Sequence, residues 1–425
     1  MIRVFLVFSL MAASADAALT WRSSAVNQDI AMAVLETRVD SAAPPLIVYL
    51  ENLAAPRSGT ESDEAILNDF KAEGFLVVTL DYAHRPEARW PMLNRDLAAL
   101  REQIQKKGFL EGRAVDTKHI FIVPSGHRLK RDVVFYREPN RTLAFDLIYP
   151  SHPNRSVGTV LEFSCDNKDR MGNFSLNFCT DTLLEGAATE GFAVAMADHP
   201  VPTPYAGIDP MPECIWKTKA AVRTLRSEVT ALGMSDRIVP VGFSRGSGMA
   251  LLLVTTQHIA SAATPSDSIF SATTIGQTDH SKNEAAEVDG NPHGEHLKVD
   301  SAVQGAVVLS GRFTYLDLLP DDKMIPRYNA LWGDREHHEG FWRAQGALDY
   351  LTAPTEPLFL SINCTESPDA LHQMEVFRRR LTELHSPFEY HLDEQPRGHR
   401  VPLTPEVLDP MLAYLKKRLG DPKHP

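Results

Sequence analysis

An apolar strand that runs through a glycine-framed serine into an apolar helix constrains this chain more than any other feature. Residues 237–242 are mostly apolar, and Gly242-Phe243-Ser244-Arg245-Gly246 leads into a second apolar run at 249–253. Glycine two positions before and after a serine permits a sharp, strained turn, where larger side chains would clash with the strand or the helix. Such a turn presents the hydroxyl at the end of the strand, so the pattern predicts Ser244 as a nucleophile.

The residues around this turn also predict where a developing negative charge would be held. The helix that begins after Ser244 favours an anion at its N-terminus, and the backbone N–H of Arg245 is placed to donate to an oxyanion. A second donor is expected in the loop after the strand at 157–164. Cys165 and Asp166 are its candidates, and spacing alone does not choose between them.

A serine hydroxyl needs a base to accept its proton, and the base needs a carboxylate to orient it. After this type of turn the partners follow in the order serine, acid, histidine. His399 lies beside Gly398 in a loop between an expected strand at 388–392 and a final helix, and we predict it as the base. Glu366 is the preferred acid, and Asp369 is the alternative. Either carboxylate would also suit the N-terminus of a helix that starts near Ala370.

From Pro45 onward, strands and helices alternate, which is typical of a parallel sheet covered by helices. Strands are expected at 46–50, 75–82, 119–123, 157–164, 191–198 and 237–242, with helices at 61–73, 92–106, 176–190 and 212–232. The order is the same on both sides of residue 125, and the distances from Gly74 to Ser125 and from Gly191 to Ser244 are 51 and 53 positions. We interpret this as a weak internal repeat of about 120 residues. Its alternative is the general likeness of any two strand-helix-strand stretches.

The chain is accordingly divided into a signal peptide at 1–17, a truncated and non-catalytic α/β domain at 18–124, and a catalytic α/β domain at 125–425. A hairpin with strands at 132–136 and 143–149 is expected to open the catalytic domain. Residues 256–302 are polar and aperiodic, which indicates an insertion after the helix that follows Ser244.

The first residues have the three parts of a signal peptide. Arg3 precedes an apolar run at 4–13, and Ala15-Asp16-Ala17 fits a cleavage site. The run is too short to cross a bilayer, which needs about 20 residues, and no later stretch qualifies as a membrane span. A secreted or periplasmic protein is expected. The net charge of −12 disfavours nucleic acid as a partner.

No metal or cofactor is expected. The four cysteines (Cys165, Cys179, Cys214 and Cys364) form no C-x-x-C pair, and their pairing is left open. Two clusters, His293-Gly294-Glu295-His296 and His337-His338-Glu339, lack the spacing of a helical zinc site. Trp332, Phe341 and Trp342 are expected either to line a substrate pocket or to belong to the core.

With the serine turn, the acid after a strand and the late Gly-His, residues 128–420 resemble the α/β-hydrolase superfamily. The resemblance implies a mostly parallel eight-stranded sheet with flanking helices. The segment Ala347-Leu348-Asp349-Tyr350-Leu351 is similar to one in secreted esterases that remove acetyl or feruloyl groups from plant polysaccharides. Arg245 is similar to an arginine of glucuronoyl esterases that aids oxyanion stabilisation, although Phe243 stands where that family has cysteine.

These features favour a serine carboxylesterase that acts on carbohydrate esters or small acyl esters, without a cofactor. One alternative is a serine peptidase that resembles the prolyl oligopeptidases, although those enzymes carry a large N-terminal propeller. The other is a catalytically inactive hydrolase fold used as a binding module. An intact serine, acid and histidine in the expected order argues against the inactive form.

Overall fold

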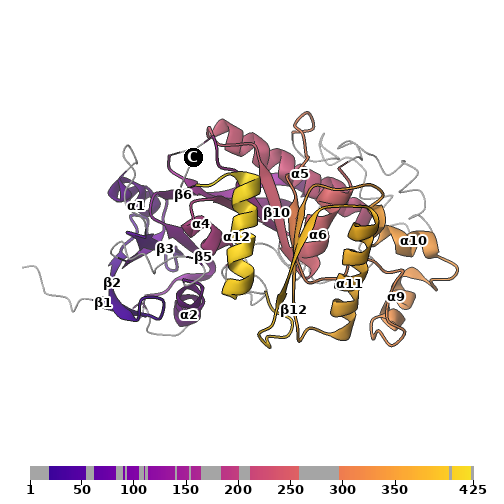
Figure 1. Cartoon of the computed structure of the whole chain (residues 1–425). Helices are drawn as coiled ribbons and strands as arrows, with labels where there is room; N and C mark the ends of the chain where they lie inside the picture. Colours follow the sequence, from indigo (N-terminus) through magenta and orange to yellow (C-terminus); the bar gives the residue numbers. More distant parts are fainter. Residues whose placement is uncertain are drawn as a thin grey trace, which may run out of the picture.

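The computed structural model describes two β-sheets, which lie side by side in Figure 1. The described residues are 19–53, 62–82, 90, 93–104, 110, 113–138, 141–152, 155–163, 183–200, 211–257, 296–401 and 404–422. The proposed signal peptide and most of the proposed insertion lie outside them. We call β1–β5 the N-terminal sheet and β6–β13 the main sheet.

The main sheet has eight strands in the order β13-β12-β11-β10-β8-β9-β7-β6. Its strands are β6 (His127–Glu138), β7 (Arg141–Pro150), β8 (Thr159–Phe163), β9 (Ala193–Ala197), β10 (Ile238–Phe243), β11 (Ala306–Leu309), β12 (Leu358–Asn363) and β13 (Phe388–Asp393). All neighbours are parallel except β7, which is antiparallel to both β6 and β9. The β6–β7 pair is the expected hairpin. Near-continuous apolar burial in β8–β12 reflects a parallel sheet covered on both faces.

The N-terminal sheet repeats the order of the first five strands of the main sheet. Its order is β1-β2-β4-β3-β5, with strands β1 (Leu19–Ser23), β2 (Gln28–Leu35), β3 (Pro45–Glu51), β4 (Leu76–Asp81) and β5 (Asp116–Pro124). Orientation matches as well, because β2 is antiparallel to both of its neighbours whereas β3, β4 and β5 are parallel. The β1–β2 hairpin was not expected from the sequence. It is the counterpart of β6–β7.

Helices cover both faces of the main sheet. Apolar residues of α5 (Met211–Ala231), α6 (Arg245–Thr255) and α11 (Pro368–Glu383) enter the core on one face, and those of α4 (Leu183–Thr189) and α12 (Pro405–Leu419) enter it on the other. The polar solvent-facing side and apolar core-facing side of α11 and α12 follow the helical period.

The two sheets share a hydrophobic core. One face of β3, β4 and β5, with α1 (Asp63–Ala72), belongs to the same buried cluster as α4, α12 and one face of the main sheet. Trp90 is 1% exposed and packs on Gly186 of α4, where any side chain would overlap the indole ring. The opposite face of the N-terminal sheet is covered by α2 (Asn94–Ile104).

A small aromatic cluster lies at the end of the molecule opposite the N-terminal sheet, at α9 (Ile325–Trp332) and α10 (Glu339–Ala344) (Figure 1). Trp332, Phe341 and Trp342 are buried in it together with Tyr328. Of the two expected placements for these residues, the structure gives the core. Ring planes of Tyr328 and Trp332 stack with centroids 4.6 Å apart.

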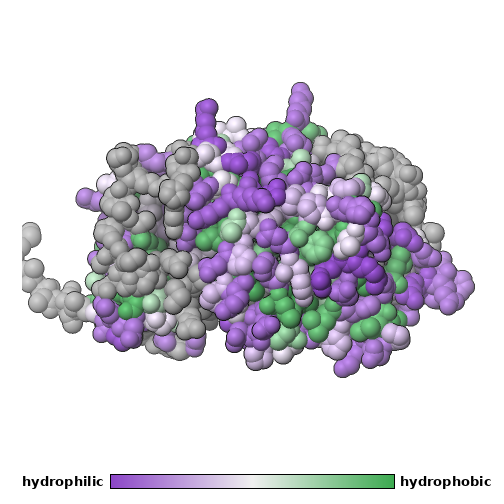
Figure 2. Space-filling model, in the orientation of Figure 1, coloured by the Kyte–Doolittle hydropathy of each residue, from purple (hydrophilic) through white to green (hydrophobic). Residues whose placement is uncertain are grey.

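Hydrophilic residues cover most of the described surface seen in Figure 2, and hydrophobic residues appear between them in smaller groups. Among the described residues, the large hydrophobic side chains that are exposed are Val39, Leu297 and Leu392. No described helix is both long and apolar enough to cross a membrane.

Candidate active site

Ser244 lies on a strained turn between β10 and α6. Its backbone has φ 56° and ψ −121°, a conformation that non-glycine residues adopt rarely and that costs free energy. The turn is tight enough that a Cβ atom on Gly242 would overlap the carbonyl of Gly246, which explains glycine at 242. The serine therefore stands at the N-terminus of an 11-residue helix, where the helix dipole favours negative charge.

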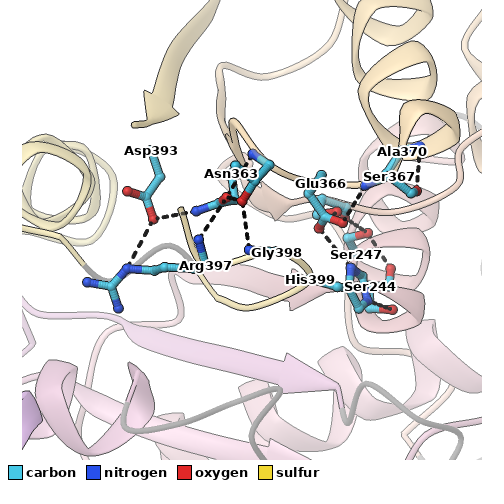
Figure 3. Close-up of polar contacts among 12 residues, drawn as sticks. Ser244, Ser247, Asn363, Glu366, Ser367, Ala370, Asp393, Arg397, Gly398 and His399 are labelled. Atoms are coloured by element: carbon cyan, nitrogen blue, oxygen red, sulfur yellow. Dashed lines mark hydrogen bonds and ion pairs between the residues drawn. The ribbon is translucent and has the colours of Figure 1, made fainter. Parts of the chain in front are cut away.

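Three side chains from distant parts of the chain form a continuous hydrogen-bonded row (Figure 3). His399 Nε2 lies 3.0 Å from Ser244 Oγ, and His399 Nδ1 lies 2.7 Å from Glu366 Oε1. The carboxylate is 1% exposed, whereas 46% of the imidazole surface is open. An ionised carboxylate only accepts hydrogen bonds, so Nδ1 carries the proton that it donates to Glu366 and Nε2 is free to accept from the serine.

The loop that carries His399 is tied to the end of β12, which also leads to Glu366. Asn363 is fully buried, and its Nδ2 donates to Asp393 Oδ2 at 3.2 Å and to the carbonyl of Gln395 at 2.6 Å. Its Oδ1 accepts from the backbone N–H of Arg397 at 3.3 Å. Thr365 Oγ1 accepts from the N–H of Gly398, next to the histidine, at 2.9 Å. These bonds fix the loop that carries His399 against the loop that carries Glu366 (Figure 3).

Three contacts of the row were not expected from the sequence. Ser310, directly after β11, donates from its hydroxyl to Glu366 Oε1 at 2.6 Å. Ser247 donates from its hydroxyl toward the carbonyls of Ser244 and Ser310, at 2.5 Å each. The ring of Phe243 lies 4.7 Å from the imidazole ring of His399, centroid to centroid. The available signal for Ser310 was the Ser-Gly pair after the apolar run at 306–309.

The alternative acid, Asp369, lies in the first turn of α11, where Ser367 is the N-cap and accepts from the N–H of Ala370. An acidic side chain there suits the helix dipole. Of the two carboxylates, the structure brings Glu366 to His399.

Arg245 is exposed in the first turn of α6. Burial, the largest effect, and Tyr315 raise the pKa of Tyr328 in the aromatic cluster, and the positive charge of Arg245 lowers it. The arginine thus lies toward the aromatic cluster. Cys165 and Asp166, the candidates for a second oxyanion donor, lie outside the described residues.

The two histidines of the cluster at 337–339 form hydrogen bonds with nearby Asp334. His337 Nδ1 lies 2.7 Å from Asp334 Oδ2, and His338 Nδ1 lies 3.0 Å from the carbonyl of Asp334. Most of the other histidine cluster lies outside the described residues. Within the described part of the chain, no group of three or more His, Cys, Asp or Glu side chains is arranged to hold a metal ion.

Neither protein-family models nor curated protein sequences match this chain. Solved structures do. A truncated form of a carbohydrate esterase from gut microbiota aligns with a TM-score of 0.50 and 14% identity, over 68% of this chain and 95% of that one. A bifunctional GH43-CE protein of Bacteroides eggerthii aligns with a TM-score of 0.50 and 17% identity, over 68% of this chain and 38% of that one. At these identities the likeness concerns the fold alone. Together with the mostly parallel eight-stranded sheet and its flanking helices, it shows that the chain has an α/β-hydrolase fold, preceded by a smaller α/β sheet.

Proposed function

We propose that this protein is a serine hydrolase that cleaves carboxylic esters through an acyl-enzyme. The observation that carries the proposal is the row Ser244–His399–Glu366, in which each side chain is within hydrogen-bond distance of the next and the serine stands on a strained turn. A buried carboxylate, an imidazole and a hydroxyl in this geometry are the parts that acyl transfer requires.

In the proposed reaction, Ser244 Oγ attacks the ester carbonyl while His399 Nε2 accepts the hydroxyl proton. Glu366 orients the ring and stabilises the imidazolium that forms. The backbone N–H of Arg245 donates to the oxyanion at the N-terminus of α6, and collapse of the tetrahedral intermediate releases the alcohol, which takes the proton from His399. Water then attacks the acyl-serine while His399 accepts a proton from the water. His399 returns this proton to Ser244 Oγ, which releases the carboxylic acid and restores Ser244.

Carbohydrate esters or small acyl esters are the substrates we propose. The exposed edge of His399 supports a site open to an alcohol carried on a larger molecule. The name of one of the two similar structures, a carbohydrate esterase, points to carbohydrate esters. Because the fold hosts many chemistries, the acyl group and the alcohol need a direct test.

The two alternatives receive less support from the described residues. Residues 19–124 form one five-stranded α/β sheet in their described part, rather than the blades of the propeller found in prolyl oligopeptidases. The intact row at Ser244 disfavours an inactive binding module. Export to the periplasm or the exterior, proposed from residues 1–17, fits an extracellular ester. Western blotting of cell fractions after expression of the full chain tests it, and retention in the cytoplasm would contradict it.

Hydrolysis of p-nitrophenyl acetate by the mature protein and by Ser244→Ala tests the function. We expect kcat to fall by about 10⁴-fold or more in the variant, because the chemistry loses its nucleophile. Two matched controls are Ser125→Ala, which alters the serine after β5 in the N-terminal sheet, and Asp369→Asn, which alters the other carboxylate. Both should retain wild-type kcat. Equal activity of Ser244→Ala and wild type would disprove the assignment of the nucleophile.

A second experiment keeps the test independent of the choice of ester. A fluorophosphonate reacts with activated serines, so mass spectrometry of the digested protein should find the adduct on the peptide that contains Ser244. Protein with neither adduct nor turnover would favour the inactive binding module. Acetylated, feruloylated and glucuronoyl esters, assayed with a peptide control, then separate the substrate classes by kcat/KM.

A further inference from the structure

A buried serine directly after β11 is hydrogen-bonded to the same carboxylate oxygen as His399. Ser310 is 1% exposed and follows β11, and its Oγ lies 2.6 Å from Glu366 Oε1. His399 Nδ1 lies 2.7 Å from the same oxygen. The other carboxylate oxygen, Oε2, accepts a longer bond of 3.3 Å from the N–H of Ser367.

The direction of the hydrogen bond from Ser310 follows from the chemistry of its partner. An ionised carboxylate has no proton to donate, so the single hydroxyl proton of Ser310 points at Oε1. A carboxylate that is 1% exposed requires such donors to remain charged, and hydrogen bonds to a charged group are stronger than neutral ones. The bonds from Ser310 Oγ and His399 Nδ1 to Glu366 Oε1 also fix the position of this oxygen, and hence the position of the imidazole that it holds.

The backbone of Ser310 is held in a conformation that would relax without support. Its φ is 56°, the left-handed region that disfavours side chains, and Ser244 at the end of the adjacent strand has the same value. Its N–H donates to the carbonyl of Ser361 on β12 at 2.9 Å, and its carbonyl accepts from Ser247 Oγ on α6 at 2.5 Å. Strain that is retained by contacts from two elements points to a positional role for this side chain.

We propose that Ser310 is a positioning residue that acts on the reaction through Glu366. This inference rests on the proposed esterase function. The hydroxyl holds Oε1 in line with His399 Nδ1, so that the imidazole faces Ser244 with Nε2. Ser361 on β12 provides a comparison, because its Oγ is also buried but has no hydrogen-bond partner among the described residues. A serine can thus be buried here without such a bond, so burial alone does not explain the bond from Ser310 to Glu366.

A double-mutant cycle tests the proposal with p-nitrophenyl acetate as substrate. Ser310→Ala should lower kcat about 10-fold, the effect of one hydrogen bond to a charged group, and leave KM within about 2-fold. In the Glu366→Ala background, the same substitution should change kcat by less than about 2-fold, because the hydroxyl no longer has its acceptor. Residual catalysis by triad variants keeps that background measurable.

Two further variants separate positioning from folding. Ser310→Gly removes the same hydroxyl and relieves the positive φ, so it should lose as much kcat as Ser310→Ala even though its backbone is less strained. Ser361→Ala, on the adjacent strand, should retain wild-type kcat and KM. Thermal unfolding of each variant shows whether it is folded.

The outcomes are distinguishable. If Ser244→Ala is inactive while Ser310→Ala matches wild type, Ser310 has no role and the esterase function stands. Equal loss from Ser310→Ala in the wild-type and Glu366→Ala backgrounds would also overturn the proposal, because the effect would not pass through the carboxylate. If Ser244→Ala keeps activity, the proposed function itself fails.

Discussion

The N-terminal sheet and the first five strands of the main sheet have the same strand order and orientation, yet the described residues place a hydrogen-bonded serine row at the main sheet alone. The difference begins after the fifth strand. Strand β10 runs through Ser244 into α6, whereas β5 runs through Ser125 and Gly126 directly into β6. The serine at the end of β10 is thus followed by a helix, whereas the serine at the end of β5 is followed by a strand.

The turn after β5 leads directly into β6 of the main sheet and is held by hydrogen bonds to β3 and α1. The N–H of Gly126 donates to Tyr49 Oη at 2.9 Å and to Asp63 Oδ1 at 3.1 Å, and Tyr49 donates to the same carboxylate at 2.6 Å. At the position two residues before Ser125 stands Val123, which is fully buried, where the main sheet has Gly242. The side chain of a valine does not permit the tight turn of β10.

The remaining difference is the set of strands that follow. In the main sheet, β11, β12 and β13 lead to Ser310, Glu366 and His399, and the described residues of the N-terminal sheet include no counterpart of these strands. We infer that the strands common to both sheets position the proposed nucleophile, whereas its activation depends on the strands β11 to β13.

The largest expected effect comes from giving the turn after β10 the valine that stands before the turn after β5. Gly242→Val introduces a side chain that would overlap the backbone at Gly246, so the turn at Ser244 has to open. We expect a loss of at least about 10³-fold in kcat/KM on p-nitrophenyl acetate, because a displaced nucleophile loses its alignment. Ser125→Ala is the control in the N-terminal sheet. Retained activity in Gly242→Val would mean that the tight turn is dispensable.

The next effect concerns stability and tests whether the two sheets unfold as one unit. Trp90→Ala removes an indole that is 1% exposed and packs on Gly186, and we expect the free energy of unfolding to fall by about 3–5 kcal/mol. Urea unfolding followed by tryptophan fluorescence and by residual activity should give coincident curves, because the sheets share a core.

Val39→Ala is the matched control for that experiment, since this side chain is 47% exposed and should change stability by less than about 0.5 kcal/mol. Activity that persists through a first transition in fluorescence would show that the N-terminal sheet unfolds by itself.

The smallest expected effect concerns Asp349, which lies between β11 and β12, two strands without a counterpart in the described part of the N-terminal sheet. Burial raises the pKa of Asp349 from 3.8 to about 6, against the lowering effects of its hydrogen bond from Thr314 and of Arg343 and Arg380. Between these two pKa values the folded state retains a proton that the unfolded chain has lost. The contribution of this group to stability therefore falls as pH rises from about 4 to 6 and stays low above that range.

Asp349→Asn removes this titration. From pH 4.5 to 7.5, the stability of the variant relative to wild type should rise by on the order of 2 kcal/mol, as measured by urea unfolding at several pH values. A difference that is constant with pH would show that Asp349 has the same pKa in the folded and unfolded states.

The sequence by itself determined the parts of this protein that depend on local pattern. Apolar runs of strand length and helical periodicity located β3 to β10 and their helices to within a few residues where the structure describes them. The turn at Ser244 was evident because a strand, two glycines and a helix follow one another within a short stretch. The β1–β2 hairpin was missed although its burial alternates, because strands were predicted only from Pro45 onward, and β11 was missed because it is only four residues long.

Tertiary structure decided what depends on contacts between distant segments. Glu366 and Asp369 lie three positions apart after a strand, and the sequence favoured Glu366 but left both open. Only the fold turns Glu366 toward His399 and leaves Asp369 at the N-terminus of α11. Ser310 reaches Glu366 across 56 positions, and Trp90 reaches Gly186 across the boundary between the two sheets. Hydrogen bonds and packing act over a few ångströms in space, so a pattern read along the chain does not contain them.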